Sequence, residues 1–183
     1  MKTLMRVFLL ASLTVVCGCS TSGSKSTFQP SPAEAQLVEL MAQRLELARE
    51  VAWIKFQNNA KVRDPKREAA LLTSLTMEAR TMGISPIMAE DFFEAQIRAS
   101  RTVQTELIWG WKRGQTLPAI APKDLQRDIR PKLDRISKAL LRELVVLSGT
   151  IRDPRLKSYA AQTIRARGFS SNAARQAVEP LWR

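Results

Sequence analysis

The sequence predicts an all-α protein, a bundle of about six helices. Apolar residues recur at three- and four-residue spacing through most of the chain after residue 31, which is the period of an amphipathic helix. Several of these segments begin with a capping residue followed by proline and end at glycine or asparagine, the usual boundaries of helices. No segment shows the alternation of apolar and polar residues that is typical of a half-buried strand.

Residues 1–19 are typical of a signal peptide. Lys2 and Arg6 give it a positive start, and residues 7–16 form a mostly apolar stretch that is too short to span a bilayer as a helix. We therefore expect an exported protein, periplasmic or secreted. Two interpretations of the cleavage site stay open. The segment around Cys19 resembles a bacterial lipoprotein box, in which Cys19 is acylated and anchors the chain to lipid, whereas ordinary secretory cleavage leaves no lipid.

A flexible tether, residues 20–31, is expected before the helical domain, residues 32–183. The N-terminal half of this domain carries three predicted helices, at residues 32–58, 65–82 and 86–112. Asp64 and Ser85 each stand directly before a proline, so each reads as an N-cap followed by the residue type favoured at the first helical position.

Residues 114–122 form a predicted linker to the C-terminal half, residues 123–183. Three more helices are predicted there, within residues 124–148, from residue 154 to residue 168, and after residue 171. Pro131 marks either the start of the fourth helix or a kink in it.

A tripeptide of the N-terminal half, Arg-Asp-Pro at residues 63–65, recurs at residues 152–154. It is either a trace of an internal repeat or a chance recurrence of a common helix start. A repeat would place leucines of the second copy opposite Arg44, Lys55 and Arg67 of the first. On that interpretation residues 32–113 hold the functional site, and residues 123–183 are a structural half.

Composition excludes several kinds of chemistry. The chain has no histidine, and its two cysteines, Cys17 and Cys19, both lie in the leader. The domain therefore has no Ser–His or Cys–His nucleophile, no disulfide and no metal site of the usual zinc type. The net charge is +12, but no run of five or more basic residues occurs, so a nucleic-acid or polybasic membrane tract is not favoured.

Two cations of the first predicted helix share one stripe. Arg44 and Lys55 are eleven residues apart, so they differ by about 20° around the helix and lie about 16 Å apart along its axis. Two long cationic side chains placed in this way can converge on an anion between them. Because the stripe also carries apolar residues, we expect both cations to be partly buried and to need a partner. That partner is either an internal carboxylate or a bound anion.

Two polar pairs accompany these cations. Ser100 and Gln104 are four residues apart and share a face of the third helix, among apolar residues where a buried amide must find hydrogen-bond partners. Arg67 and Glu68 lie in the first turn of the second helix. Each pair alone is compatible with an ordinary structural role, as satisfied core residues or as solvated surface.

Together these residues resemble the active-site pattern of the all-helical, type II chorismate mutases. The pattern consists of Arg44, Lys55, Asp64, Arg67, Glu68, Ser100 and Gln104. The surrounding segments agree, among them residues 42–45, 51–55, 62–68 and 92–100. The resemblance covers residues 32–113, and the export signal with the long C-terminal extension is similar to the secreted, periplasmic branch of the family.

The resemblance implies that the substrate is chorismate, a small dianion, which rearranges to prephenate in aromatic amino-acid biosynthesis. The step is intramolecular and uses no covalent intermediate, metal or cofactor, so it can proceed without histidine or cysteine. The family also implies a homodimer, with no nucleic-acid partner.

By resemblance, three residues are catalytic. Arg44 is expected to grip a substrate carboxylate bidentately. Lys55 is expected to contact a carboxylate and the ether oxygen, and Gln104 to donate its amide N–H to the same oxygen.

The remaining residues are expected to bind substrate. Glu68 and the backbone near Asp64 take the ring hydroxyl, while Arg67 and Ser100 help to hold the carboxylate end. The secreted branch supplies one further arginine from the second half of the chain. Arg130 matches best by its spacing to the apolar residues that follow it, and Arg127 is a rival.

Two other functions stay open at this stage. A catalytically silent helical protein that binds anionic metabolites would keep the cations without needing Glu68 and Gln104 in place. A basic helical module for nucleic acid or envelope lipid would show a continuous basic face and an affinity that falls steeply with salt.

Overall fold

The computed structural model describes residues 28–119, 121, 123–148 and 153–182. These residues form helices and no strands, which confirms the predicted all-α bundle of about six helices. The helices are α1 (Pro32–Gln57), α2 (Pro65–Thr81), α3 (Pro86–Lys112), the π-helical turn η1 (Leu125–Ile129), α4 (Arg130–Val146), α5 (Pro154–Ala166), α6 (Ser171–Val178) and the 3-10 turn η2 (Glu179–Trp182). The predicted signal peptide, with Cys17 and Cys19, lies outside the described residues.

The helix starts follow from local capping. The Ser31 hydroxyl accepts from the Glu34 backbone N–H, and the Glu34 carboxylate accepts from the Ser31 N–H at 2.7 Å. This reciprocal pair satisfies two backbone donors that the helix itself cannot satisfy. Asp64 caps α2 in a similar way, by accepting from the Arg67 N–H. Pro131 lies in the first turn of α4, which continues directly from the π-helical turn η1, so the helical segment itself begins at Leu125 after the N-cap Asp124.

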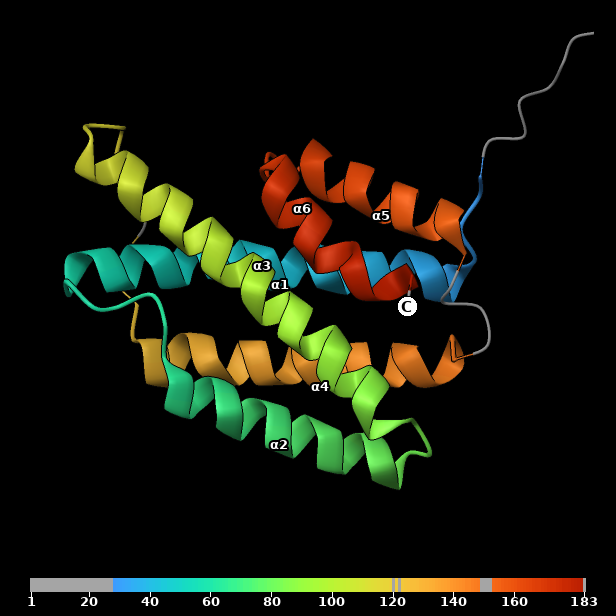
Figure 1. The fold of residues 1–183 in the computed structure, drawn as a ribbon. Coiled ribbons are helices and arrows are strands. Elements are labelled where there is room, and N and C mark those ends of the chain that lie inside the picture. The colour runs from blue at the N-terminus through green and yellow to red at the C-terminus, as the bar shows by residue number, and fades with distance from the viewer. Residues whose placement is uncertain (1–27, 120, 122, 149–152, 183) are drawn as a thin grey trace, which may run out of the picture.

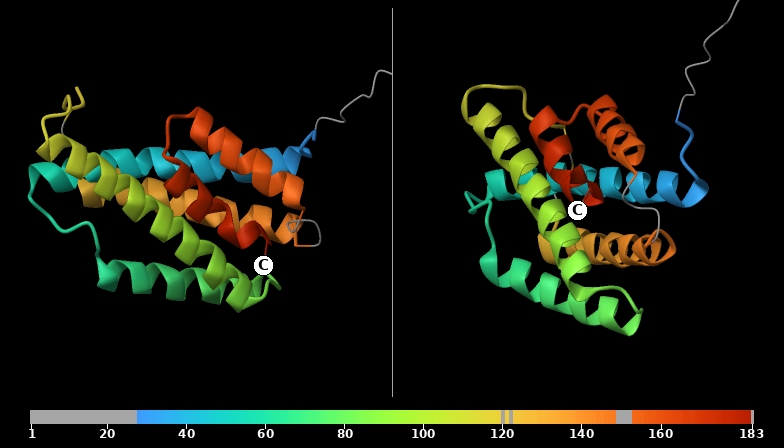
Figure 2. Two further views of the ribbon diagram at one scale, coloured as in Figure 1. Left: turned by 45° about the horizontal axis from the view of Figure 1, so that its top comes forward. Right: turned by 45° about the vertical axis from the view of Figure 1, so that its right-hand side comes forward.

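The helices pack around α1 (Figure 1). α3 crosses α1, while α4 runs antiparallel to it and α2 lies along the outer side of α4 (Figure 1). α5 lies on the other side of α1 from α2 and α4, and α6 packs against α3 and α5 (Figures 1 and 2). As a consequence, α2 and α4 both begin at the end of the molecule where α1 finishes.

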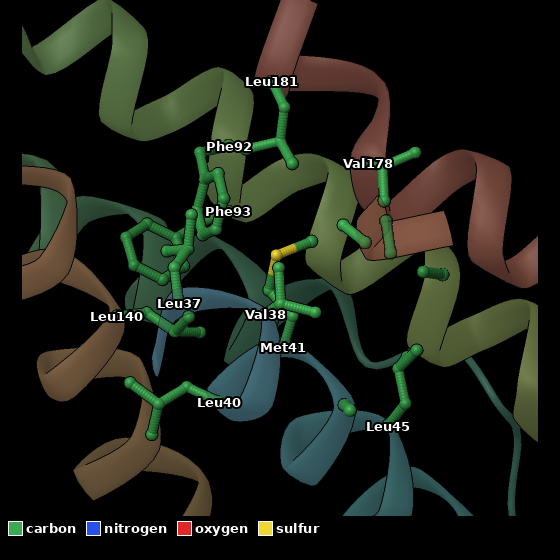
Figure 3. Packing of buried hydrophobic residues seen from close by; sticks show 14 of the residues in the cluster. Leu37, Val38, Leu40, Met41, Leu45, Phe92, Phe93, Leu140, Val178 and Leu181 are labelled. Atoms are coloured by element: carbon green, nitrogen blue, oxygen red, sulfur yellow. The ribbon is translucent and has the colours of Figure 1, made fainter. Parts of the chain in front are cut away.

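The core joins the two halves of the chain. Phe92 and Phe93 of α3 meet edge to face, with ring centroids 5.2 Å apart, and are almost completely buried. Leucines of α1 and α4 surround them, and Val178 of α6 and Leu181 of η2 close the cluster from the C-terminal side (Figure 3). This apolar burial holds α1, α3 and α4 in fixed positions, which in turn fixes the polar side chains they carry.

The domain begins slightly before the predicted boundary at residue 32. The ring of Phe28 packs against Tyr159 of α5, with centroids 6.0 Å apart, and the Arg155 guanidinium lies over it. An aromatic ring in a small, polar segment is better buried than left in water, so the last residues of the predicted tether join the fold. No helix in the described part of the chain is long and apolar enough to cross a membrane.

Candidate active site

A cavity of about 110 Å³ lies between α1, α2, α3 and the start of α4. It brings together every residue that the sequence analysis named as substrate-binding. These are Arg44, Lys55, Asp64, Arg67, Glu68, Ser100, Gln104 and Arg130. The rival arginine, Arg127, does not line the cavity; it is exposed and pairs with Asp128 at 3.0 Å.

Arg44 enters the cavity from the middle of α1 and is only 4% exposed. Its Nη1 donates to the Ser100 hydroxyl at 2.7 Å and to the Gln96 carbonyl at 2.9 Å. Among the described residues its Nε has no hydrogen-bond partner, and no carboxylate forms an ion pair with it. Burial lowers the pKa of Arg44 to about 10, although the charge of Asp134 opposes the shift. The guanidinium is therefore held in place but lacks a counter-anion.

Lys55 is in the same situation near the C-terminal end of α1. Its Nζ donates to the Val62 carbonyl and, at 3.0 Å, to Oε1 of Gln104. It has no ion-pair partner in the part of the chain that the structure describes. Burial lowers the pKa of Lys55, while the negative charges of Asp64 and Glu68 act in the opposite direction. The sequence left two alternatives for the partner of these cations, an internal carboxylate or a bound anion. Neither Arg44 nor Lys55 has an internal carboxylate partner among the described residues.

The contact with Lys55 also orients Gln104. An ammonium group can only donate, so the side-chain oxygen of Gln104 must face it. The amide NH2 is then the end that remains available to donate a hydrogen bond inside the cavity. Gln104 is 6% exposed, so its amide sits in a largely dehydrated position.

Glu68 is fixed at both carboxylate oxygens. One accepts from the Asp64 backbone N–H at 3.4 Å, and the other accepts from Arg101 at 3.3 Å. This arrangement places an acceptor for a hydroxyl group beside the cations, at the start of α2.

Arg67 and Arg130, in contrast, do have carboxylate partners. Arg67 pairs with Asp134 of α4. Arg130, at the start of α4, pairs with Asp64 at 3.1 Å and also donates to Gln126. Because α2 begins here, the positive end of its helix dipole also favours an anion in the cavity.

Sequence reasoning missed two charged lining residues, Arg101 and Asp134. Asp134 follows Arg130 by four residues, the spacing that places two side chains on one helix face, so this signal was available. Arg101 follows Ser100 directly, and its position on the cavity wall depends on how α2 packs against α3. The described residues contain no group of three His, Cys, Asp or Glu side chains placed to hold a metal ion.

Similarity to known proteins identifies the family of this chain. A family model described as chorismate mutase type II matches residues 33–105. The secreted chorismate mutase of Mycolicibacterium smegmatis is 29% identical over 168 residues, which are 88% of this chain and 91% of the relative. The chorismate mutase structure from Burkholderia thailandensis is 33% identical, with a TM-score of 0.73, over 82% of this chain and 99% of that one. The structure from Burkholderia phymatum is 26% identical, with a TM-score of 0.74, over 82% of this chain and 96% of that one. The chain belongs to the type II chorismate mutase family.

Proposed function

We propose that the protein converts chorismate to prephenate in this cavity, as a cofactor-independent isomerase. The observation that carries the proposal is the pair Arg44 and Lys55, two buried cations that face one cavity without a carboxylate partner among the described residues. Burying a cation without a counter-anion is unfavourable. A dianionic substrate supplies the missing charge.

The chemistry needs positioning and charge, not a nucleophile. The ether C–O bond of chorismate breaks while a C–C bond forms between the enolpyruvyl arm and the ring, within one molecule. Arg44 holds a carboxylate, which restricts the arm to a folded conformation. Lys55 and the amide NH2 of Gln104 donate to the ether oxygen, where negative charge develops as the C–O bond lengthens.

The other side chains fix the remaining groups of the substrate. Glu68 accepts a hydrogen bond from the ring hydroxyl. Arg130 and Arg67 hold the carboxylates from the α4 and α2 sides, and Ser100 supports Arg44 by its hydroxyl. The C-terminal half therefore contributes to the site through Arg130.

A silent binding protein for anionic metabolites is the second candidate, and no contact favours it. Such a protein would need Arg44 and Lys55, but it would not need an amide oriented toward the centre of the cavity by Lys55. Purified protein that binds but does not consume chorismate, measured by the loss of its absorbance, would support this candidate.

We infer export from the pattern of residues 1–19, and relatives named secreted chorismate mutase support the inference. Periplasmic location, acylation of Cys19 and a homodimer stay predictions of the sequence.

Replacing Lys55 with Ala is expected to lower kcat by about 10²-fold or more, because a preorganised donor to the ether oxygen is lost. The measurement is the initial rate of chorismate consumption. Lys61→Ala is the matched control, since Lys61 is exposed in the turn after α1 and is expected to keep the wild-type rate. An unchanged rate in Lys55→Ala would contradict the proposed role.

The pH dependence of kcat tests Gln104. An amide does not titrate, so turnover is expected to stay nearly flat between about pH 5 and pH 7.5. At higher pH, kcat/KM is expected to decline, because burial has lowered the pKa of Lys55 and the cation is lost as pH rises through it. In Gln104→Glu the carboxyl must be protonated to donate, so activity is expected to fall as pH rises across the lower range. A steep loss in the wild type there, or a flat profile in the variant, would argue against this role.

The two candidate arginines of the C-terminal half are expected to behave differently. Arg130→Ala removes a charge-assisted hydrogen bond to a substrate carboxylate, so kcat/KM is expected to fall by about 10- to 100-fold. Arg127→Ala is expected to stay within about twofold of the wild type, because Arg127 is exposed and does not line the cavity. The reverse order of effects in steady-state kinetics would assign the site to Arg127.

A further inference from the structure

Two ion pairs connect the starts of α2 and α4 crosswise. Asp64 of the α2 start pairs with Arg130 of α4, and Asp134 of α4 pairs with Arg67 of α2. All four side chains line the cavity. Two carboxylates therefore already occupy the arginines that we assign to the substrate.

Asp64 and Asp134 differ in what else they do. Asp64 also caps α2, by accepting from the Arg67 backbone N–H at 3.1 Å, so it has a structural task. Asp134 forms its hydrogen bond with Arg67 alone among the described residues, and its side chain is 42% exposed. The fold does not need this carboxylate in order to start a helix or to fill the core.

A carboxylate at this position opposes the binding of a dianion. It repels the ligand directly, and it occupies the guanidinium that a ligand carboxylate would use. Because half-exposed ion pairs are weak, the contact can be exchanged for another anion. Asp134 also adds negative potential at Arg44, opposing the fall in the pKa of that guanidinium.

We propose that Asp134 is an affinity-limiting residue, which competes with a carboxylate of the bound molecule for Arg67. This inference rests on the proposed function. Prephenate, like chorismate, carries two carboxylates, so the competition weakens substrate and product together. A site with Arg44, Lys55, Arg67 and Arg130 all free would bind the product dianion tightly and release it slowly. Uniformly tight binding does not increase turnover.

The test uses Asp134→Asn in the full mature protein. Asparagine has the same shape and can still accept a hydrogen bond from Arg67, so the change removes charge and leaves the geometry in place. We expect the KM for chorismate and the inhibition constant of prephenate each to fall by about three- to tenfold, the factor for one partly screened charge. Glu143→Gln is the matched control, since Glu143 lies on the same helix about 14 Å further along, does not line the cavity, and is expected to leave both constants unchanged.

The same substitution in an Arg67→Gln variant separates competition for Arg67 from direct repulsion of the ligand. In Arg67→Gln the guanidinium is absent and only the direct repulsion by Asp134 remains, so adding Asp134→Asn is expected to lower both constants by a clearly smaller factor than in the wild-type background. An unchanged or raised KM in Asp134→Asn overturns the proposal, as does an equal gain in Glu143→Gln or in the Arg67→Gln background. Absence of turnover in the wild type would instead contradict the proposed function, so the two failures are distinguishable.

Discussion

The site depends on the burial of two cations on one stripe of α1. Arg44 and Lys55 sit among apolar positions, and their hydrogen-bond partners among the described residues are carbonyl, hydroxyl and amide oxygens. Neutral acceptors fix the direction of each cation but leave its charge uncompensated. The described part of the chain therefore leaves both cations free to pair with a bound anion. The cavity needs rigid walls for this to hold, and the crossing of α3 over α1, filled by Phe92 and Phe93, provides them.

Four of the five cations that line the cavity serve two different purposes. Arg44 and Lys55 lie on the central helix and have no ion-pair partner among the described residues, so they favour the binding of a dianion. Arg67 and Arg130 lie at the junction of α2 and α4, where Asp134 and Asp64 neutralise them. This second pair can exchange partners as ligands come and go. Under our proposal, the partial neutralisation of Arg67 by Asp134 allows an anionic product to leave the site that recognised its precursor.

Much of this arrangement could be predicted from the sequence, because the relevant signals are local. Each cap followed by proline specified a helix start, and helical spacing placed Arg44 with Lys55 and Ser100 with Gln104. The contacts that sequence reasoning missed join residues far apart in the chain. The pairing of Arg67 with Asp134, and the contact of Arg101 with Glu68, depend on how α2 packs against α4 and α3. Helical periodicity gives the face of a residue but not its partner across a helix interface. The π-helical turn before Arg130 was missed for a related reason, since Pro131 allowed either a start or a kink.

The free energy of unfolding of Arg44→Met, set beside its activity, tests the central claim most directly. If Arg44 is a buried cation whose counter-anion is a bound ligand, replacing it with the uncharged methionine removes the unfavourable burial of a charge. Ser100 keeps its hydrogen bond to the Gln96 carbonyl. Stability measured by urea denaturation is then expected to stay equal or to rise by about 1–4 kcal/mol, while kcat/KM collapses. A loss of about 3–5 kcal/mol of stability, the effect of breaking a buried ion pair, would contradict this account.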